Sequence, residues 1–325
     1  MQRRSLLITL ALVAGGLPCT APAQAQAWPS RPVRIIVGYP PGGATDVAAR
    51  LLAAELSKSL GQQVVIENKP GAGGMVAGSY VVRSEPDGYT LLMGASAEVT
   101  IAPVTVKAMP FDPMKDLVPI TLVGQVPFFM VINPGLPVST LAEFIAYAKA
   151  NPGKLNYSSF GNNTSNHFAG ELFKSMAGVN TIHVPYKGSG PSIADLVGGQ
   201  VQYTFDSPPA VIEQVRGGRL RALAISGPVR LASLPDVPTF AEAGLPGFSG
   251  GTWFGLLAPA ATPAPLIAKI NTAVVNVLHS PEMRGAFAER NILVGGDTPA
   301  EFGQFIQAEV SKWKALANKV GIVAE

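Results

Sequence analysis

The chain has 325 residues, a formal net charge of +3 and one cysteine, Cys19. A charge this near zero, with no run of Lys and Arg, argues against nucleic acid as a partner. A single cysteine excludes disulfides within the chain. Charged residues make up only 14% of the sequence, beside 35 glycines and 29 prolines, which indicates many tight turns around a large apolar core.

The N-terminal segment has the three parts of a secretory signal. Arg3 and Arg4 precede an apolar stretch over residues 5–17, and Ala-Gln-Ala occurs twice, ending at Ala25 and at Ala27. The stretch is too short for a membrane span, which needs about 20 residues. We therefore expect residues 1–27 to be a signal peptide, cleaved near Ala25 or Ala27, and the rest to be periplasmic. The sequence leaves export by the general or the twin-Arg route open.

Short β-branched segments alternate with helical patterns after residue 28, which is typical of a parallel α/β sheet. Strands are expected at 33–37, 64–66 and 89–93, with helices between and after them. The first helix should be capped by Thr45 or Asp46 and end at Gly61, and the second should cover 75–84.

Two apolar segments, 118–123 and 128–132, could carry the chain from this lobe into a second one. Thr140 and Glu143 form a capping box before the next helix. The second series has strands at 155–158, 181–185 and 201–205, and helices at 167–176, 191–197 and 211–216. The strand at 221–225 is expected to return to the first lobe, which then gains a strand at 253–258 and helices at 265–278 and 300–317.

Three loops at strand–helix junctions are rich in glycine, hydroxyl and amide side chains: 39–46, 71–74 and 158–167. Glycine lets a ligand approach the backbone closely, and free N–H groups at a helix start favour an anion. The same residues are also ordinary turn and cap residues, so each loop has a purely structural alternative.

Sequence signatures of catalysis, metal binding and nucleotide binding are missing. No loop fits the phosphate-binding patterns, and the three histidines lack zinc spacing. His183 is expected in the core or at a strand end, whereas His167 opens a helix in the third loop and could face a ligand. Asp206 follows a strand and could either bind a ligand or cap the next helix.

The order of several short motifs identifies a family. The motifs are Tyr-Pro-Pro-Gly-Gly-Ala-Thr-Asp at 39–46, Glu-Asn-Lys-Pro-Gly-Ala-Gly-Gly at 67–74, Pro-Asp-Gly-Tyr-Thr-Leu-Leu at 86–92, His-Val-Pro-Tyr-Lys-Gly at 183–188, Leu-Pro-Asp-Val-Pro-Thr at 234–239 and Glu-Ala-Gly-Leu-Pro-Gly at 242–247. From Trp28 onward the chain resembles the substrate-binding proteins of tripartite tricarboxylate transporters, the Bug family.

This resemblance implies a two-lobed, type II periplasmic-binding-protein α/β fold, in which each lobe is a mostly parallel sheet flanked by helices. Residues 28–130 and 222–325 would form the first lobe and 131–221 the second. The ligand would be a small carboxylate, held by backbone N–H groups and hydroxyls. The residues placed at the ligand are Tyr39, Gly43, Thr45, Asp46, Ser96, Ser158, Asn162, Asn163, Thr164, Ser165, His167, Tyr186 and Asp206. Asn163 stands where the family usually has glycine, and asparagine also tolerates a left-handed backbone.

We therefore expect a monomeric solute-binding protein without cofactor, metal or catalytic residues. Its partners would be a small carboxylate and membrane transporter subunits. A sensor component that reports to a membrane receptor is an alternative, and an α/β enzyme acting on a small organic acid is a weaker one.

Overall fold

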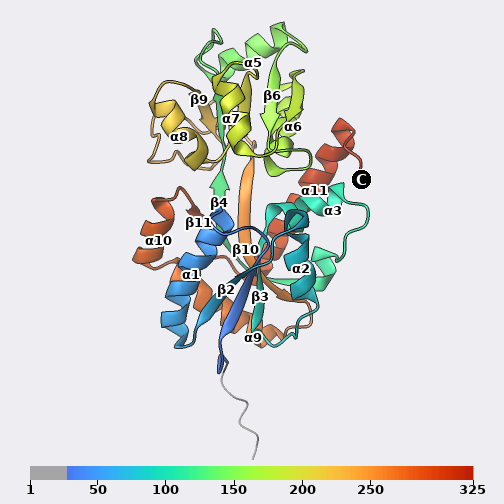
Figure 1. The fold of residues 1–325 in the computed structure, drawn as a ribbon, viewed down its shortest axis with the longest axis vertical. Coiled ribbons are helices and arrows are strands. Elements are labelled where there is room, and N and C mark those ends of the chain that lie inside the picture. Colours follow the sequence, from blue (N-terminus) through green and yellow to red (C-terminus); the bar gives the residue numbers. More distant parts are fainter. Residues whose placement is uncertain (1–27, 325) are drawn as a thin grey trace, which may run out of the picture.

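The computed structural model describes residues 28–324, which form two α/β lobes stacked along the long axis of the molecule (Figure 1). The predicted signal peptide, its cleavage site and Cys19 lie outside the described residues. The first lobe contains a six-stranded sheet of order β11-β4-β10-β3-β1-β2, and the second a five-stranded sheet of order β7-β6-β8-β5-β9. The predicted two-lobed α/β fold is confirmed. The expectation that each sheet is mostly parallel is wrong for the strand pairing, because β10 and β11 pair antiparallel in the first sheet and β5 pairs antiparallel with both β8 and β9 in the second.

The first sheet has a parallel half and an antiparallel half. Strand β1 pairs in parallel with β2 and β3, while β10 runs antiparallel to both β3 and β4. The bounds are β1 Val33–Val37, β2 Val64–Asn68, β3 Thr90–Ala95, β4 Leu117–Pro127, β10 Gly251–Pro259 and β11 Leu293–Val294.

Helices cover both faces of this sheet. Helices α1, α9 and α10 pack on one face around Leu52, Ile270 and Phe287, and α2 and α11 pack on the other around Val81 and Phe302. The bounds are α1 Ala44–Leu60, η1 Ala72–Gly74, α2 Met75–Val82, η2 Ala97–Ile101, α3 Ala102–Thr105, α4 Pro113–Asp116, α9 Ala264–Leu278, α10 Pro281–Ala288 and α11 Pro299–Val320. Of these, η1, η2, α3, α4 and α10 were not predicted.

The second lobe is built around an aromatic core in which Phe173 contacts Phe144, Tyr203, Phe205 and Phe240. The bounds are β5 Phe129–Ile132, α5 Leu141–Ala150, β6 Asn156–Ser159, α6 Ser165–Ala177, β7 Ile182–Pro185, α7 Ser189–Val197, β8 Tyr203–Asp206, α8 Pro208–Arg216 and β9 Arg221–Ile225. The capping box of α5, with Thr140 and Glu143, is confirmed.

The chain crosses between the lobes at different points from those expected. The first crossing follows β4, close to the predicted position. The strand β9, however, pairs with β5 inside the second sheet, so the prediction that it returns to the first lobe is wrong. Phe240 and Phe248 also pack in the second core, and the chain returns only at Gly250 and Gly251, where β10 begins. The hydroxyl of Ser226 connects the two crossings, since it accepts a hydrogen bond from Phe128 N–H and donates one to the Gly250 carbonyl.

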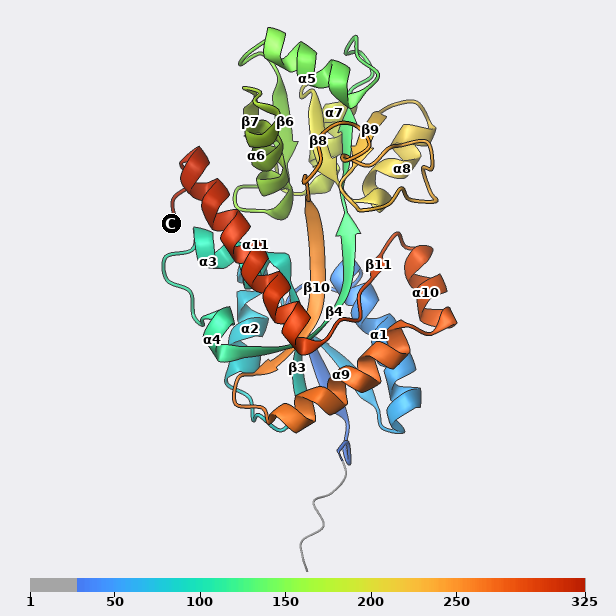
Figure 2. The same cartoon turned by 180° about the vertical axis from the view of Figure 1, so that it is seen from behind.

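Helix α11 connects the two lobes along one side of the molecule (Figure 2). It starts on the first sheet and reaches α6 of the second lobe, where the Trp313 and Phe168 rings meet edge to face with centroids 5.5 Å apart. Within the described part of the chain, no helix combines the length and the apolar character that a membrane span requires.

Three predicted helix starts are wrong in detail. The N-cap of α1 is Gly43, which has no side chain to cap with, and Asp46 lies inside the helix. The N-cap of α8 is Ser207 rather than Asp206, and the helix begins directly with Pro208, whose missing N–H and fixed φ suit a first turn. Helix α6 starts at Ser165 because the Thr164 side chain caps it, two residues before the predicted start.

Candidate functional site

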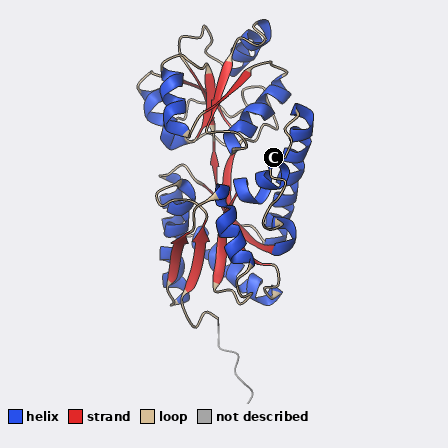
Figure 3. Cartoon of the chain, turned by 45° about the vertical axis from the view of Figure 1, so that its right-hand side comes forward, coloured by secondary structure: helices blue, strands red, loops and turns tan. Residues whose placement is uncertain are grey.

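A cleft of about 410 Å³ lies between the lobes, beyond the carboxyl ends of β1, β3 and β6. This volume suits a small ligand. Figure 3 shows the second lobe connected to the first by the extended strands that pass beside this region. The residues that line the cleft are Tyr39, Thr45, Ala72, Gly73, Met75, Ala95, Ser96, Ala97, Ala102, Thr105, Val106, Phe160, Asn162, Asn163, Thr164, Ser165 and Thr252.

The first-lobe loop after β1 is held in shape by Asp46. Its buried carboxylate accepts hydrogen bonds from the Gly42 N–H, the Arg50 guanidinium and the Asn68 amide, at 2.8–3.0 Å. Burial alone would raise the pKa of Asp46, but the bonds from Arg50 and Asn68 outweigh it and lower the pKa. Asp46 does not line the cleft, and its carboxylate is already engaged by this loop.

Thr45, by contrast, lies in the cleft wall, and its hydroxyl makes no hydrogen bond to any residue in the described range 28–324. The residue is 8% exposed, so the first turn of α1 positions it firmly. Its hydroxyl is therefore available to donate a hydrogen bond into the cleft.

A second pair of hydroxyls joins two strands at the cleft. Ser96 Oγ, at the end of β3, lies 3.0 Å from Thr252 Oγ1, at the start of β10. Ser96 was predicted, whereas Thr252 was missed. A threonine directly after two glycines at a strand start was a weak signal for it, because β10 was not expected to begin beside the second lobe.

The loop after β6 supplies the opposite wall. Thr164 Oγ1 donates to the Gly161 carbonyl and Asn166 Oδ1, both at 2.7 Å, and accepts from the His167 N–H. Asn163 has φ 63°, so the left-handed backbone expected for it is confirmed. The first N–H groups of α6 thus lie beside cleft-lining residues at a helix start, where an anion is favoured.

Seven of the predicted ligand residues line the cleft and six do not. Those in the wall are Tyr39, Thr45, Ser96, Asn162, Asn163, Thr164 and Ser165; those elsewhere are Gly43, Asp46, Ser158, His167, Tyr186 and Asp206.

Four members of the second group have structural partners within the second lobe, whereas Gly43 and Asp46 lie at the start of α1 in the first lobe. Ser158 Oγ accepts from Ser192, Tyr186 donates to Asp195, and His167 accepts from the Asn163 N–H through Nδ1. Asp206 is fully buried and accepts from Ser189 Oγ at 2.6 Å and from the Ser207 N–H, and burial raises its pKa to about 6.

Behind the cleft wall, in contact with Tyr39, lies a titratable residue that the sequence analysis missed. Glu98, in η2, is fully buried, and its carboxylate accepts hydrogen bonds from the Tyr39 hydroxyl at 2.5 Å and the Ala95 N–H at 2.7 Å. Burial raises the pKa of Glu98 to about 7. A lone acidic residue inside an apolar run, Ala95 to Val99, was the signal available.

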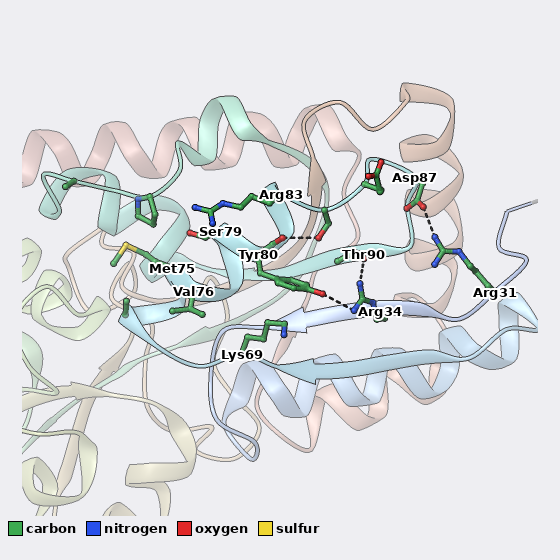
Figure 4. Close-up of a pocket in the computed structure, with 15 residues that line it drawn as sticks. Arg31, Arg34, Lys69, Met75, Val76, Ser79, Tyr80, Arg83, Asp87 and Thr90 are labelled. Atoms are coloured by element: carbon green, nitrogen blue, oxygen red, sulfur yellow. Dashed lines mark hydrogen bonds and ion pairs between the residues drawn. The ribbon is translucent and has the colours of Figure 1, made fainter.

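A larger hollow of about 1100 Å³ lies on the outer face of the first lobe, beside α2 (Figure 4). It contains four basic side chains, but three of them are tied to neighbours. Arg31 pairs with Asp87, Lys69 pairs with Glu67, and Arg34 donates to Tyr80 and Thr90. This hollow receives nothing from the second lobe, and its charge is largely neutralised, so the cleft between the lobes is the stronger candidate.

The cleft offers neutral donors rather than ions. None of the described residues that line it carries a formal charge, and its polar atoms are hydroxyls, amides and backbone N–H groups. Within residues 28–324 no three His, Cys, Asp or Glu side chains cluster as metal ligands would. The arrangement can hold a small anion by hydrogen bonds from both lobes.

The chain is similar to known proteins over most of its length. Residues 48–322 match the model of the tripartite tricarboxylate transporter family receptor. Protein BugT of Bordetella pertussis is 38% identical, over 99% of both chains. Among solved structures, R. palustris Rpa4515 with adipate is 36% identical over 92% of this chain and 100% of that one, with a TM-score of 0.78. MatC from Rhodopseudomonas palustris with bound malate is 35% identical over 89% and 99%, with a TM-score of 0.72.

Proposed function

The chain belongs to the tripartite tricarboxylate transporter family of receptors, and on this premise we propose that it captures a small carboxylate in the periplasm and delivers it to membrane transporter subunits. The observation that carries this proposal is the cleft, where neutral hydrogen-bond donors from two lobes face one another without a counter-ion. Family members with adipate and with malate support a carboxylate as the ligand class.

In this proposal each lobe supplies some of the hydrogen-bond donors that hold the ligand. The first lobe offers the hydroxyls of Thr45, Ser96 and Thr252, and the second offers Ser165 and the start of α6. Hydrogen bonds to a charged group contribute about 1.5–3 kcal/mol each, so a few such donors suffice for micromolar binding. The ligand would connect the lobes and favour their closed arrangement, because it contacts both only when they are close.

The protein would act on its ligand by binding alone. The family model and the structural relatives describe receptors and carriers of bound acids. The cleft also lacks, among its described lining residues, the pairing of a nucleophile with a base that catalysis on a small acid would need. We further propose that the exported chain is a monomer, as a two-lobed clamp needs no second copy.

Binding and turnover can be tested on the exported protein together. Adipate and malate would be titrated by calorimetry and by thermal shift, with hexanediol as the uncharged control for adipate. A ligand at 100 times its Kd should add about 2.7 kcal/mol to the free energy of unfolding. Hexanediol should have no effect, and the acid should be recovered unchanged. Failure of a broad carboxylate panel to bind would contradict the ligand class, and a new product would contradict a pure binding role.

A further inference from the structure

Glu98 connects three of the segments that line the cleft. Its carboxylate accepts the Tyr39 hydroxyl of the first loop and the Ala95 N–H of β3. On a third side it packs against Gly74, where an added Cβ would lie 2.6 Å from the Glu98 carboxyl carbon. This fully buried side chain is therefore connected to the cleft through Tyr39, which lines it.

No cation compensates this carboxyl within the described structure. The packed elements β3, η1 and α3 carry no titratable side chain, and Tyr39 is the titratable group in contact with it. The charged residues on the other packed helices, α4 and α11, are Lys115, Asp116, Glu301, Glu309, Lys312, Lys314 and Lys319.

These charged residues have partners of their own or face solvent. Lys115 pairs with Asp112, and Lys312 pairs with Glu309. Asp116 accepts from the Asp112 N–H and Glu301 from the Thr298 N–H, while Lys314 and Lys319 are exposed. Burial without a counter-ion favours the neutral form of a carboxyl, and it raises the pKa of Glu98 to about 7.

The single hydrogen of the Tyr39 hydroxyl connects the protonation state of Glu98 to the cleft. The hydroxyl has one hydrogen and two acceptors, Glu98 Oε2 at 2.5 Å and the Gly73 carbonyl at 3.3 Å. When Glu98 is ionised, its carboxylate accepts the hydrogen bond from the Tyr39 hydroxyl. A protonated Glu98 donates its own hydrogen to the Tyr39 oxygen instead. The Tyr39 hydrogen is then left with the Gly73 carbonyl at 3.3 Å, a long contact that an anion in the cleft can replace.

We propose that the ligand carboxylate binds together with one proton, which Glu98 holds while Tyr39 donates to the ligand. This inference rests on the proposed function. An anion in the cleft repels an ionised Glu98 and attracts the freed Tyr39 hydrogen, so both effects favour protonation of Glu98 in the complex.

The pH dependence follows from linkage. If the complex binds more protons than the free protein, affinity is highest at low pH and falls as pH rises through the pKa of Glu98 in the free protein. The fall approaches tenfold per pH unit, until the higher pKa of the complex is passed. Simple carboxylic acids, with pKa values of about 4, are fully ionised above pH 7 and add no protons of their own.

The decisive measurement is calorimetric titration with adipate and with malate at pH 7.5, in phosphate and in Tris. The two buffers differ in ionisation enthalpy, so the difference in heat gives the protons taken up per ligand. We expect an uptake of up to about three quarters of a proton, because about a quarter of Glu98 is already protonated at pH 7.5, with an affinity that weakens between pH 7 and 8.5. Binding with no proton uptake in the wild-type protein overturns this inference and leaves the proposed function intact, whereas no binding of any carboxylate contradicts both.

Substitution of Glu98 tests whether this residue takes up the proton that accompanies the ligand. The Glu98→Gln amide can still accept from Ala95 and donate to Tyr39, which imitates the protonated acid. This variant should bind with the same affinity from pH 7 to 8.5 and take up no proton. Glu213→Gln, at an exposed position on α8, is the matched control and should keep the wild-type uptake. Persistent uptake in folded Glu98→Gln would overturn the assignment to Glu98; if that variant does not fold, the wild-type measurement still decides.

Discussion

The imidazole rings of His167 and His183 stack with centroids 4.1 Å apart and an interplanar angle of 16°. His183 Nε2 also lies 2.6 Å from Ser159 Oγ, and the ring stacks on Tyr157 on its other side. Burial, followed by the neighbouring His167, lowers the pKa of His183 to about 4, and burial lowers that of His167. Both rings are therefore neutral at pH 7 and form part of the framework beneath the third ligand loop.

This pair should make the second lobe sensitive to acid. The unfolded chain has histidine pKa values near 6.5, so between pH 6.5 and 4 it binds more protons than the folded protein. Stability contributed by the neutral rings is present above pH 6.5 and is lost as pH falls. His183→Phe keeps a stacked ring without a titrating group, so its melting temperature should fall less than that of the wild type between pH 7 and 5.

The pH dependence of melting must be compared between the wild type and His183→Phe rather than measured on the wild type alone. Asp206 and Glu98 have raised pKa values, and their contributions change with pH in the opposite direction. Their effects cancel in the difference between wild type and His183→Phe. Parallel melting curves across this pH range would show that the His183 proton has no part in stability.

Thr45→Val should weaken ligand binding with little effect on folding. The Thr45 hydroxyl has no hydrogen bond within the described residues, and Gly43 rather than Thr45 occupies the N-cap of α1. Loss of a hydrogen bond to a charged ligand costs about 1.5–3 kcal/mol, so affinity should fall roughly 10- to 150-fold. Calorimetric titration measures the affinity and thermal melting the stability. Unchanged affinity would remove Thr45 from the site.

Thr164→Val should lower both the stability of the protein and its affinity for the ligand. The hydroxyl caps α6, and loss of a cap costs about 1 kcal/mol of stability. The cap also fixes the loop that carries Asn162 and Asn163 into the cleft, so affinity should fall as well. Thr140→Ala, which removes the cap of α5 away from the cleft, is the matched control and should lose similar stability with affinity intact. Equal affinities in the two variants would contradict this placement of the loop.

The alternation of strands and helices was predictable because residues close together in the sequence determine it. Gly61 ends α1 and the Thr140–Glu143 box starts α5, as predicted. The return strand was assigned wrongly because its position depends on long-range pairing. Strand β9 has the same apolar character as any buried strand, and its partner β5 lies about 90 residues earlier.

About half of the predicted ligand residues line the candidate cleft for a similar reason. Loops at strand ends meet in one cleft whatever their exact residues, so Thr45 and Thr164 both lie in its wall. The direction of a side chain within a loop is decided by local hydrogen bonds, which placed Asp46 and Asp206 away from the cleft. Glu98 was missed because its function depends on contacts with Tyr39 and Gly74, which are distant in sequence.

Gly170→Ala should destabilise the second lobe although alanine is the better helix former. An added Cβ in α6 would lie 2.2 Å from the buried Tyr157 ring, and overpacking of this kind typically costs about 1–3 kcal/mol. Gly190→Ala, in α7, meets no atom within 4 Å and should raise stability by up to about 1 kcal/mol. Urea denaturation compares the two, and a Gly170→Ala protein as stable as the wild type would show that the Tyr157 ring can move aside.

Ligand binding should bring the lobes together about the two crossings, at Phe128 and at Gly250–Gly251. Besides these segments, the Ser226 hydroxyl between them, helix α11 and a hydrogen bond from Ser233 to Asn291 hold the lobes to each other. A ligand that contacts Thr45 on one side and Ser165 on the other has a higher affinity for the closed arrangement, and this difference is what shifts the population. Small-angle X-ray scattering should therefore show a smaller radius of gyration with saturating adipate. At an adipate concentration a few times the wild-type Kd, Thr45→Val should remain in the open form, and it should close when the concentration is raised a further 150-fold. An unchanged scattering profile in wild-type protein, with binding shown by calorimetry in the same sample, would mean that the ligand is held without hinge motion.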